Sequence, residues 1–323
     1  MNVGSSNLSS PTIFSNGGVA QLVRAPACHA GGREFESRHS RHLKNMETLV
    51  VIGVLISALM HATWNSIIKG SSNHFLESMN IAFFIIFICL VGIIILPFPH
   101  SDSWPYIITT CFIHMFYHYF LTKSYTEGEM SKVYPLMRGV PPLIILLMSF
   151  FLLKENISLI GWLAVITISI GALIMNIGQS FPTKLAVFHV LIVILTIVAY
   201  TIVDGVGARL SQNSFAYISW FGFIQFTLYS LFIMKKCGFR QSLDHISTHW
   251  RKGILGACLS IFGYSIILWA VTRAPIAYVA ALRETAILFA GIIGIIVLGE
   301  RSTIFKSISI IMITLGAILI RMA

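Results

Sequence analysis

Ten long apolar runs follow one another from Met46 to the end of the chain, and each is near the length of a membrane-spanning helix. An α-helix needs roughly 20 apolar residues to cross a hydrocarbon core of about 30 Å. The runs are approximately Leu49–Ile68, Leu76–Leu96, Trp104–Leu121, Ser131–Leu153, Ser158–Ile177, Leu185–Val203, Phe215–Met234, Lys252–Thr272, Ala277–Leu298 and Thr303–Ile320. The longest connection between them is Lys235–Arg251. The predicted fold class is therefore an all-α integral membrane protein with ten transmembrane helices.

The composition also points to lipid as the surroundings of these helices. Hydrophobic residues make up 56% and charged residues 11% of the 323 residues, whereas charged residues form about 25% of an average soluble domain. The formal charge is +10, from 22 Lys and Arg against 12 Asp and Glu. The basic residues do not form the dense run that binding to nucleic-acid phosphates uses. We therefore expect a lipid bilayer and no nucleic acid as partners.

The first 45 residues differ from the rest of the chain. They are rich in Gly, Ser, Arg and His, and they contain no apolar run long enough for a membrane helix or a signal peptide. The segment Gly17–Arg38, GGVAQLVRAPACHAGGREFESR, resembles the translation of a transfer-RNA gene. That resemblance implies an over-extended start and a true start at Met46, and a genuine disordered tail is the alternative.

An internal repeat relates the second half of the chain to the first. A shift of 145 residues (283 minus 138) places Arg138 on Arg283 and, in the same register, Glu155 on Glu300. Because five spans is an odd number, the second copy must lie upside down relative to the first. We predict a non-membrane segment over 1–45 and two inverted five-helix repeats over 46–178 and 184–323. Many secondary transporters have such repeats and bind their solute near the midplane between them.

The charged candidates for a functional role within or at the end of the apolar runs are Arg138, Asp204, Arg283 and Glu284. A charge at the centre of a membrane helix costs about 2.5–3.5 kcal/mol, so these side chains should face protein or water. Adjacent residues on a helix do not face each other, so Arg283 and Glu284 are expected to have different partners. Our hypothesis is that some of these charges pair across the repeats and line a polar cavity, and ion pairs that only fix helix packing are the alternative.

Three groups of polar residues are spaced three or four positions apart, which places each group on one helical face. These groups are His61, Trp64 and Asn65; His114, Tyr117 and His118; and Tyr200 with Asp204. We expect these faces to bind substrate or couple protons, with plain hydrogen bonding between helices as the alternative. Zinc normally takes four ligands, and the sequence has no HExxH motif or cysteine cluster. We therefore predict no metal and no cofactor.

The fourth run contains Pro135 and the sequence Gly139-Val140-Pro141-Pro142. Proline removes an amide donor and clashes with the carbonyl four residues earlier. We predict a kink there, whose free carbonyls face a partner helix or a cavity. The small pairs Gly171-Ala172 and Gly316-Ala317 are predicted to let helices pack closely.

Three segments carry a resemblance to a known family. They are HATWNSIIK (His61–Lys69), SKVYPLMRGVPPLIILLMSFFLLKENIS (Ser131–Ser158) and APIAYVAALRETAILFAGIIGIIVLGERST (Ala274–Thr303). With these segments the chain resembles the EamA-type members of the drug/metabolite transporter superfamily over Met46–Ala323, and HATWN also looks like a subgroup associated with phosphonate use. The resemblance implies a secondary carrier with both termini inside, whereas the distribution of Lys and Arg favours termini outside.

The predicted function is a secondary transporter that moves a small polar metabolite across the cell membrane by alternating access. The solute is expected to be an amino-acid-like zwitterion or another organic ion, in a monomer or homodimer. Proton coupling is a further hypothesis, because histidine titrates near neutral pH. An intramembrane enzyme and a non-transporting scaffold are the alternatives, although the GxSxG motif and the GxxxxGK[ST] nucleotide loop are absent from the sequence.

Overall fold

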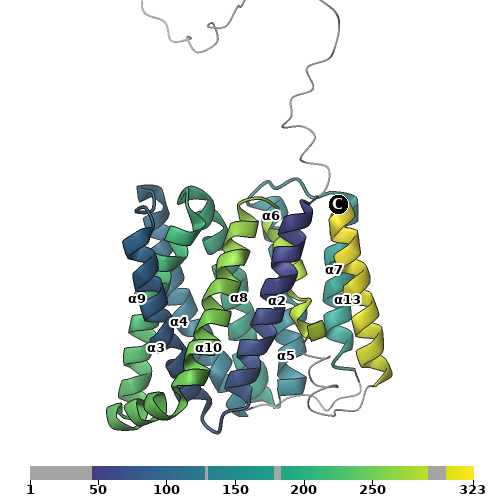
Figure 1. Ribbon diagram of the computed structural model, residues 1–323. Coiled ribbons are helices and arrows are strands. Elements are labelled where there is room, and N and C mark those ends of the chain that lie inside the picture. Colours follow the sequence, from purple (N-terminus) through teal and green to yellow (C-terminus); the bar gives the residue numbers. More distant parts are fainter. Residues whose placement is uncertain (1–45, 128–129, 178–182, 290–302) are drawn as a thin grey trace, which may run out of the picture. The chain divides into compact units, whose positions relative to one another are not determined.

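The computed structural model describes residues 46–127, 130–177, 183–289 and 303–323, and all regular structure in these ranges is helical (Figure 1). The prediction for residues 1–45 lies outside them. The elements are α2 (Thr48–Lys69), α3 (His74–Ile95), η1 (Ser101–Ser103), α4 (Trp104–Glu127), α5 (Met130–Gly139), α6 (Pro141–Phe151), α7 (Leu159–Ile174), α8 (Lys184–Leu210), α9 (Ser214–Cys237), α10 (Phe239–Val271), α11 (Ile276–Arg283) and α13 (Ile304–Met322).

Seven helical stretches in the described ranges are long and apolar enough to cross a membrane. They are α2, α3, α5 together with α6, α8, α9, α10 and α13. Helix α7 is apolar but has 16 residues, and the 24 residues of α4 include polar ones such as His114 and His118. The ninth expected run continues into 290–302, which lies outside the described residues. The fold is thus an all-α membrane protein, with seven of the ten expected runs meeting both requirements.

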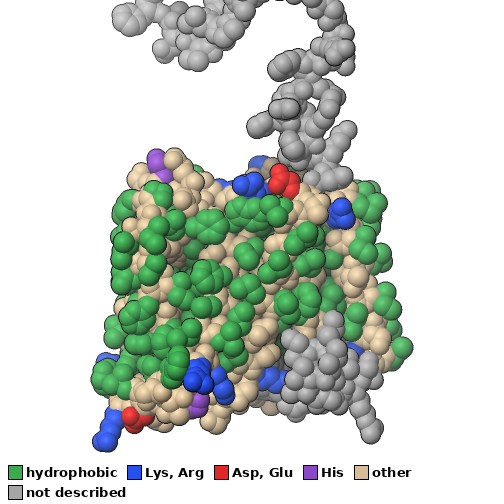
Figure 2. All heavy atoms as spheres, viewed as in Figure 1, with side chains coloured by type: hydrophobic (Ala, Val, Ile, Leu, Met, Phe, Trp, Pro, Cys, Tyr) green, Lys and Arg blue, Asp and Glu red, His purple; other side chains and the backbone are tan. Residues whose placement is uncertain are grey.

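Apolar side chains cover the outside of these helices. Ile94 is 75% exposed, Leu195 64% and Ile311 66%. Figure 2 shows hydrophobic side chains over the middle of the visible face, with charged and histidine side chains gathered toward the two ends of the helices. A soluble monomer rarely exposes apolar patches above a few hundred Å², so lipid is the medium that suits this surface.

Several helix starts are capped by matching side chains in the two halves. The side chain of Asn73 accepts hydrogen bonds from the first-turn amides of α3 at 3.1 Å, and Asn213 does the same for α9 at 3.0 and 3.1 Å. Ser158 caps α7 and Thr303 caps α13. Each cap satisfies amides that have no partner inside the helix.

The predicted long connection at Lys235–Arg251 is wrong. Gly238, with a φ of 93°, ends α9, and α10 begins at the next residue. Its early residues are polar, but Ser242 and Ile246 are buried, and His249 with a φ of −114° interrupts the helix before the apolar part. A search for continuous apolar runs does not detect a helix with one polar face.

Two helices are broken in the middle of the bundle. The predicted kink in the fourth run is confirmed, since α5 ends at Gly139 and α6 begins at Pro141. The ninth run is also broken, because α11 ends at Arg283, a turn follows at 284–285, and 286–289 are helical again. The second break lacks proline and glycine. The hydroxyl of Thr285 donates to the carbonyl of Leu282 at 2.8 Å there, and such bonds compete with the helix.

Helices from the two halves pack against one another. The most extensive contacts join α7 with α13, α3 with α9, α4 with α8, and α2 with α10. The predicted close packing of the Gly-Ala pairs is confirmed: a Cβ on Gly171 would lie 3.0 Å from Ile313, and one on Gly316 would lie 2.5 Å from Ile168. Only a residue without a side chain lets α7 and α13 approach this closely.

Replacing Gly316 with leucine should destabilise the protein by about 1–3 kcal/mol, the usual cost of overpacking. A Cβ at this position also meets the carbonyl oxygen of Ala164 at 2.9 Å, and the backbone cannot rotate away. Thermal unfolding of the purified protein in detergent measures the effect. Ile318→Leu, at a side chain that is 54% exposed on the same helix, is the control. An unchanged midpoint for Gly316→Leu would contradict the packing argument.

Candidate functional site

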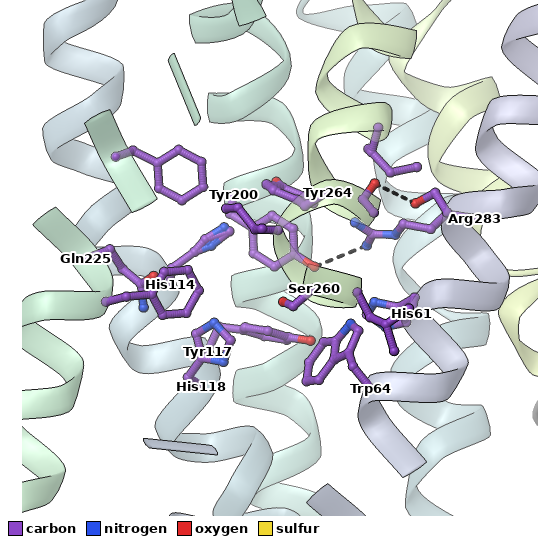
Figure 3. Close-up of a pocket in the computed structure, with 17 residues that line it drawn as sticks. His61, Trp64, His114, Tyr117, His118, Tyr200, Gln225, Ser260, Tyr264 and Arg283 are labelled. Atoms are coloured by element: carbon purple, nitrogen blue, oxygen red, sulfur yellow. Dashed lines mark hydrogen bonds between the residues drawn. The ribbon is translucent and has the colours of Figure 1, made fainter. Parts of the chain in front are cut away.

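A cavity of about 60 Å³ lies among α2, α4, α8, α9, α10 and α11 (Figure 3). Its lining consists of Ser57, His61, Trp64, His114, Tyr117, His118, Tyr200, Phe221, Gln225, Phe226, Leu259, Ser260, Ile261, Gly263, Tyr264, Ile267 and Arg283. A single water needs about 10–15 Å³, so the space holds several waters or a small polar group. The helices that are apolar outside therefore enclose a polar, aromatic-walled interior.

The broken helices place two arginines in the interior. Arg138 is next to the last residue of α5, and Arg283 is the last residue of α11. Their exposed fractions are 3% and 4%. The C-terminal end of a helix carries a partial negative charge that stabilises a cation. A buried arginine thus lies in the last turn of both α5 and α11, at two positions 145 residues apart (283 minus 138).

Arg138 forms a buried ion pair with Glu284. Its Nη1 lies 3.6 Å from Oε1 of Glu284, and the exposed fractions of the two side chains are 3% and 2%. The guanidinium also contacts Nε2 of His61 on α2. The pair confirms the predicted pairing of charges across the two halves. It also confirms that Glu284 and its neighbour Arg283 have different partners.

Arg283 has a different environment from Arg138. Its Nη2 donates to the hydroxyl of Tyr200 at 3.1 Å, and its Nε has no hydrogen-bond partner in the part of the chain that the structure describes. Within the described ranges, no carboxylate lies within ion-pair distance of Arg283. The side chain lines the cavity, beside Tyr200 in Figure 3. A buried cation without a counter-ion provides a binding position for an anion.

Asp204 is the acceptor of a buried hydrogen-bond cluster. It is 1% exposed. The hydroxyl of Tyr217 donates to it at 2.9 Å, the hydroxyl of Tyr264 at 2.5 Å, and Nε2 of His114 lies 3.3 Å away. These partners come from α9, α10 and α4, so Asp204 on α8 joins four helices. Two of the partners, His114 and Tyr264, also line the cavity.

Glu155, the residue at the end of the fourth run, positions the half-helix that carries Arg283. Its carboxylate accepts from the backbone amide of Ile276 at 3.0 Å and from Arg209 at 2.6 Å. Arg209 also donates to the carbonyls of Val271 at 2.8 Å and Ala274 at 3.0 Å. A carboxylate at a helix start and a guanidinium at a helix end both complement the helix dipole. The two residues hold the start of α11 against the end of α10.

The predicted site residues lie close together. The cavity is lined by His61, Trp64, His114, His118, Tyr200 and Arg283. Arg138 and Asp204 contact this lining without being part of it, and Glu284 pairs with Arg138. Asn65 does not line the cavity, and its amide donates to the carbonyl of His61 at 2.9 Å. Their role in binding a solute stays a prediction.

Sequence reasoning missed several residues of the site. Gln225 on α9 and Ser260 with Tyr264 on α10 line the cavity, and Tyr217 bonds Asp204. Ser260 and Tyr264 are four positions apart, so the face-spacing rule applied to His61 and Asn65 would also have found them. Gln225 is a single amide in an apolar run and offers no such pattern. In the described ranges, no three His, Cys, Asp or Glu residues are grouped to hold a metal.

Comparison with known proteins connects this architecture to transport. Residues 48–177 match the EamA-like transporter family, and no curated protein matches the chain. Among 28 matching chains of solved structures, one crystal structure has a TM-score of 0.61 at 16% identity, covering 84% of this chain and 95% of its own. Such a likeness concerns the fold alone, and neither comparison supports the phosphonate-associated subgroup. The chain is therefore a multi-pass membrane protein whose residues 48–177 are similar to the EamA-like transporter family.

Proposed function

We propose that this chain is a secondary transporter that moves a small polar solute through the central cavity by alternating access. The observation that carries the proposal is Arg283, a cation that is 4% exposed, lines the cavity and has no carboxylate partner in the described ranges. A charge inside a membrane bundle is costly, so an unpaired one at a cavity indicates a binding site. The family match over residues 48–177 supports transport, and this family is one of transporters rather than enzymes.

The arrangement of helices supports two inverted repeats of five spans over 46–178 and 184–323. Under the repeat, α2 corresponds to α8 and α4 to α10, so the contact between α2 and α10 has its counterpart in the contact between α8 and α4. The contacts of α3 with α9 and of α7 with α13 each join an element to its own counterpart. The two mid-bundle breaks, each next to a buried arginine, fit the same relation. Inverted repeats let a carrier expose one central site to either side in turn.

Proton coupling is part of the proposal. His61, His114 and His118 line the cavity, and His114 lies 3.3 Å from the buried carboxylate of Asp204. An imidazole and a carboxylate in contact offer two groups between which a proton can be passed. A proton bound in this cluster would change the charge of the cavity wall and hence its affinity for an ion.

Replacing Arg283 with alanine is expected to reduce solute flux at least tenfold. A hydrogen bond to a charged group contributes about 1.5–3 kcal/mol, and about 1.4 kcal/mol corresponds to tenfold in affinity. Proteoliposomes are loaded with a cell metabolite extract, and the solutes that leave are identified by mass spectrometry. The matched control is Arg273→Ala, since Arg273 is exposed and stacks over Trp269 with 5.0 Å to the ring centroid. Equal flux in wild type and in folded Arg283→Ala protein would reject the proposed binding site.

A further inference from the structure

We infer that the solute is an organic anion with a flat body and, at the end away from its negative group, a neighbouring hydrogen-bond donor and acceptor, as in an amide or a lactam edge. This inference rests on the proposed transport function and concerns the same cavity. It follows from three features of the lining: a cation that has no ion pair within the described residues, an amide that has no hydrogen-bond partner among them, and aromatic walls.

The charge available inside the cavity is positive. Asp204 is already the acceptor for Tyr217 and Tyr264, and Glu284 pairs with Arg138 outside the cavity lining. Among the described residues, Nε of Arg283 has no hydrogen-bond partner and the guanidinium is a buried charge that lines the cavity. A carboxylate or phosphate on the solute would supply the missing acceptor in a charge-assisted bond. A cationic solute would find no free carboxylate among these groups.

Gln225 is a buried amide whose hydrogen bonds are unmade. It is 0% exposed, it lines the cavity, and both its Oε1 and its Nε2 are without partners among the described residues. A buried polar group left unsatisfied costs about 1–3 kcal/mol, so this amide requires a partner in the cavity. A primary amide presents one acceptor and one donor side by side. The complementary solute group therefore has a donor next to an acceptor.

Gln225 and Arg283 lie on opposite sides of the cavity, with aromatic rings between them (Figure 3). His114 is stacked on Tyr200 at a centroid distance of 4.3 Å and on Phe221 at 5.3 Å, with interplanar angles of 28° and 11°. Tyr200 and Phe221 thus cover the two faces of His114, and the edges of such rings favour flat groups that meet them edge to face. The solute body between its two polar ends is therefore flat.

Three chemically matched probes test this inference with the full-length protein in lipid nanodiscs. Orotate has both a carboxylate and a lactam edge, benzoate has the carboxylate on a flat ring without the edge, and uracil has the edge without the carboxylate. Isothermal titration calorimetry gives the dissociation constants. Wild-type protein should bind orotate at least tenfold more tightly than benzoate or uracil, because one buried hydrogen bond contributes about tenfold in affinity.

Two variants assign the two ends of the solute. Gln225→Leu should remove the preference for orotate over benzoate, and Arg283→Gln should remove the preference for orotate over uracil. Gln241→Leu, at an exposed residue on α10, should leave both preferences as they are. The inference is overturned if wild type binds none of the three, if it binds benzoate as well as orotate, or if the preference survives Gln225→Leu.

The transport assay separates this inference from the proposed function. Suppose that extract solutes cross the membrane in an Arg283-dependent way but the three probes bind equally well. That result would overturn the inferred solute class, and the proposed transport function would still hold. Absence of any Arg283-dependent flux would contradict the proposed function itself, whatever the probes do.

Discussion

Replacing Glu284 with glutamine is expected to lower the free energy of unfolding by about 3–5 kcal/mol, the usual cost of removing one partner from a buried ion pair. Glu284 is 1% exposed, and its carboxylate lies 3.6 Å from the guanidinium of Arg138. Glutamine keeps the shape of the side chain and removes the charge, so the change tests electrostatics rather than packing. Thermal or denaturant unfolding in detergent measures it.

The effect should be large because the variant leaves two buried arginines without a counter-charge nearby. Arg138 loses its ion-pair partner. Arg283, the residue next to Glu284 in the chain, has no ion pair within the described residues. Removing both members of the pair should cost much less, since replacing a buried ion pair by apolar residues is often neutral. Arg138→Met with Glu284→Met is therefore expected to recover most of the lost stability.

A partly exposed ion pair provides the control for this experiment. Lys123 and Glu127 are one turn apart on α4, with a distance of 3.8 Å and exposed fractions of 37% and 24%. Pairs of this kind contribute about 0.3–0.5 kcal/mol, so Lys123→Gln should hardly change the unfolding midpoint. If the Glu284→Gln protein is as stable as the Lys123→Gln protein, the buried ion pair contributes no more to stability than a surface pair does.

Replacing Asp204 with leucine is expected to lower the free energy of unfolding by about 3 kcal/mol or more, because each buried polar group left without an acceptor costs about 1–3 kcal/mol. The hydroxyls of Tyr217 and Tyr264 and Nε2 of His114 all lose their acceptor. The same unfolding measurement applies. The control is Asp244→Leu, at an exposed position of α10, where surface changes usually stay within about 0.5 kcal/mol.

A double-mutant cycle identifies the hydrogen bonds as the cause. Tyr264→Phe should cost about 1.5–3 kcal/mol in wild type, as expected for a hydrogen bond to a charged group, and close to nothing in the Asp204→Leu background. Neighbouring residues of one hydrogen-bond network are expected to be non-additive in this way. If the losses of unfolding free energy from the two changes simply add, Tyr264 and Asp204 do not stabilise each other. That result would contradict the role assigned to the 2.5 Å hydrogen bond between them.

The membrane class and the helical fold followed from the sequence because they depend on local properties. The length of an apolar run decides whether a helix can cross a bilayer, and no partner far along the chain is needed to read it. The same holds for the break before Pro141, which proline imposes on its own helix. The prediction that Arg138, Asp204, Arg283 and Glu284 face the interior was equally local, since charge in lipid is costly wherever the helix packs.

Tertiary structure alone decided which of these interior groups meet. Arg138 and Glu284 are 146 residues apart (284 minus 138), and only the packing of broken half-helices brings them to 3.6 Å. Gln225 has no hydrogen-bond partner among the described residues, and this depends on its neighbours in space rather than on any pattern along α9. The physical reason is that a residue type determines what a side chain needs, whereas the surrounding helices determine whether that need is met.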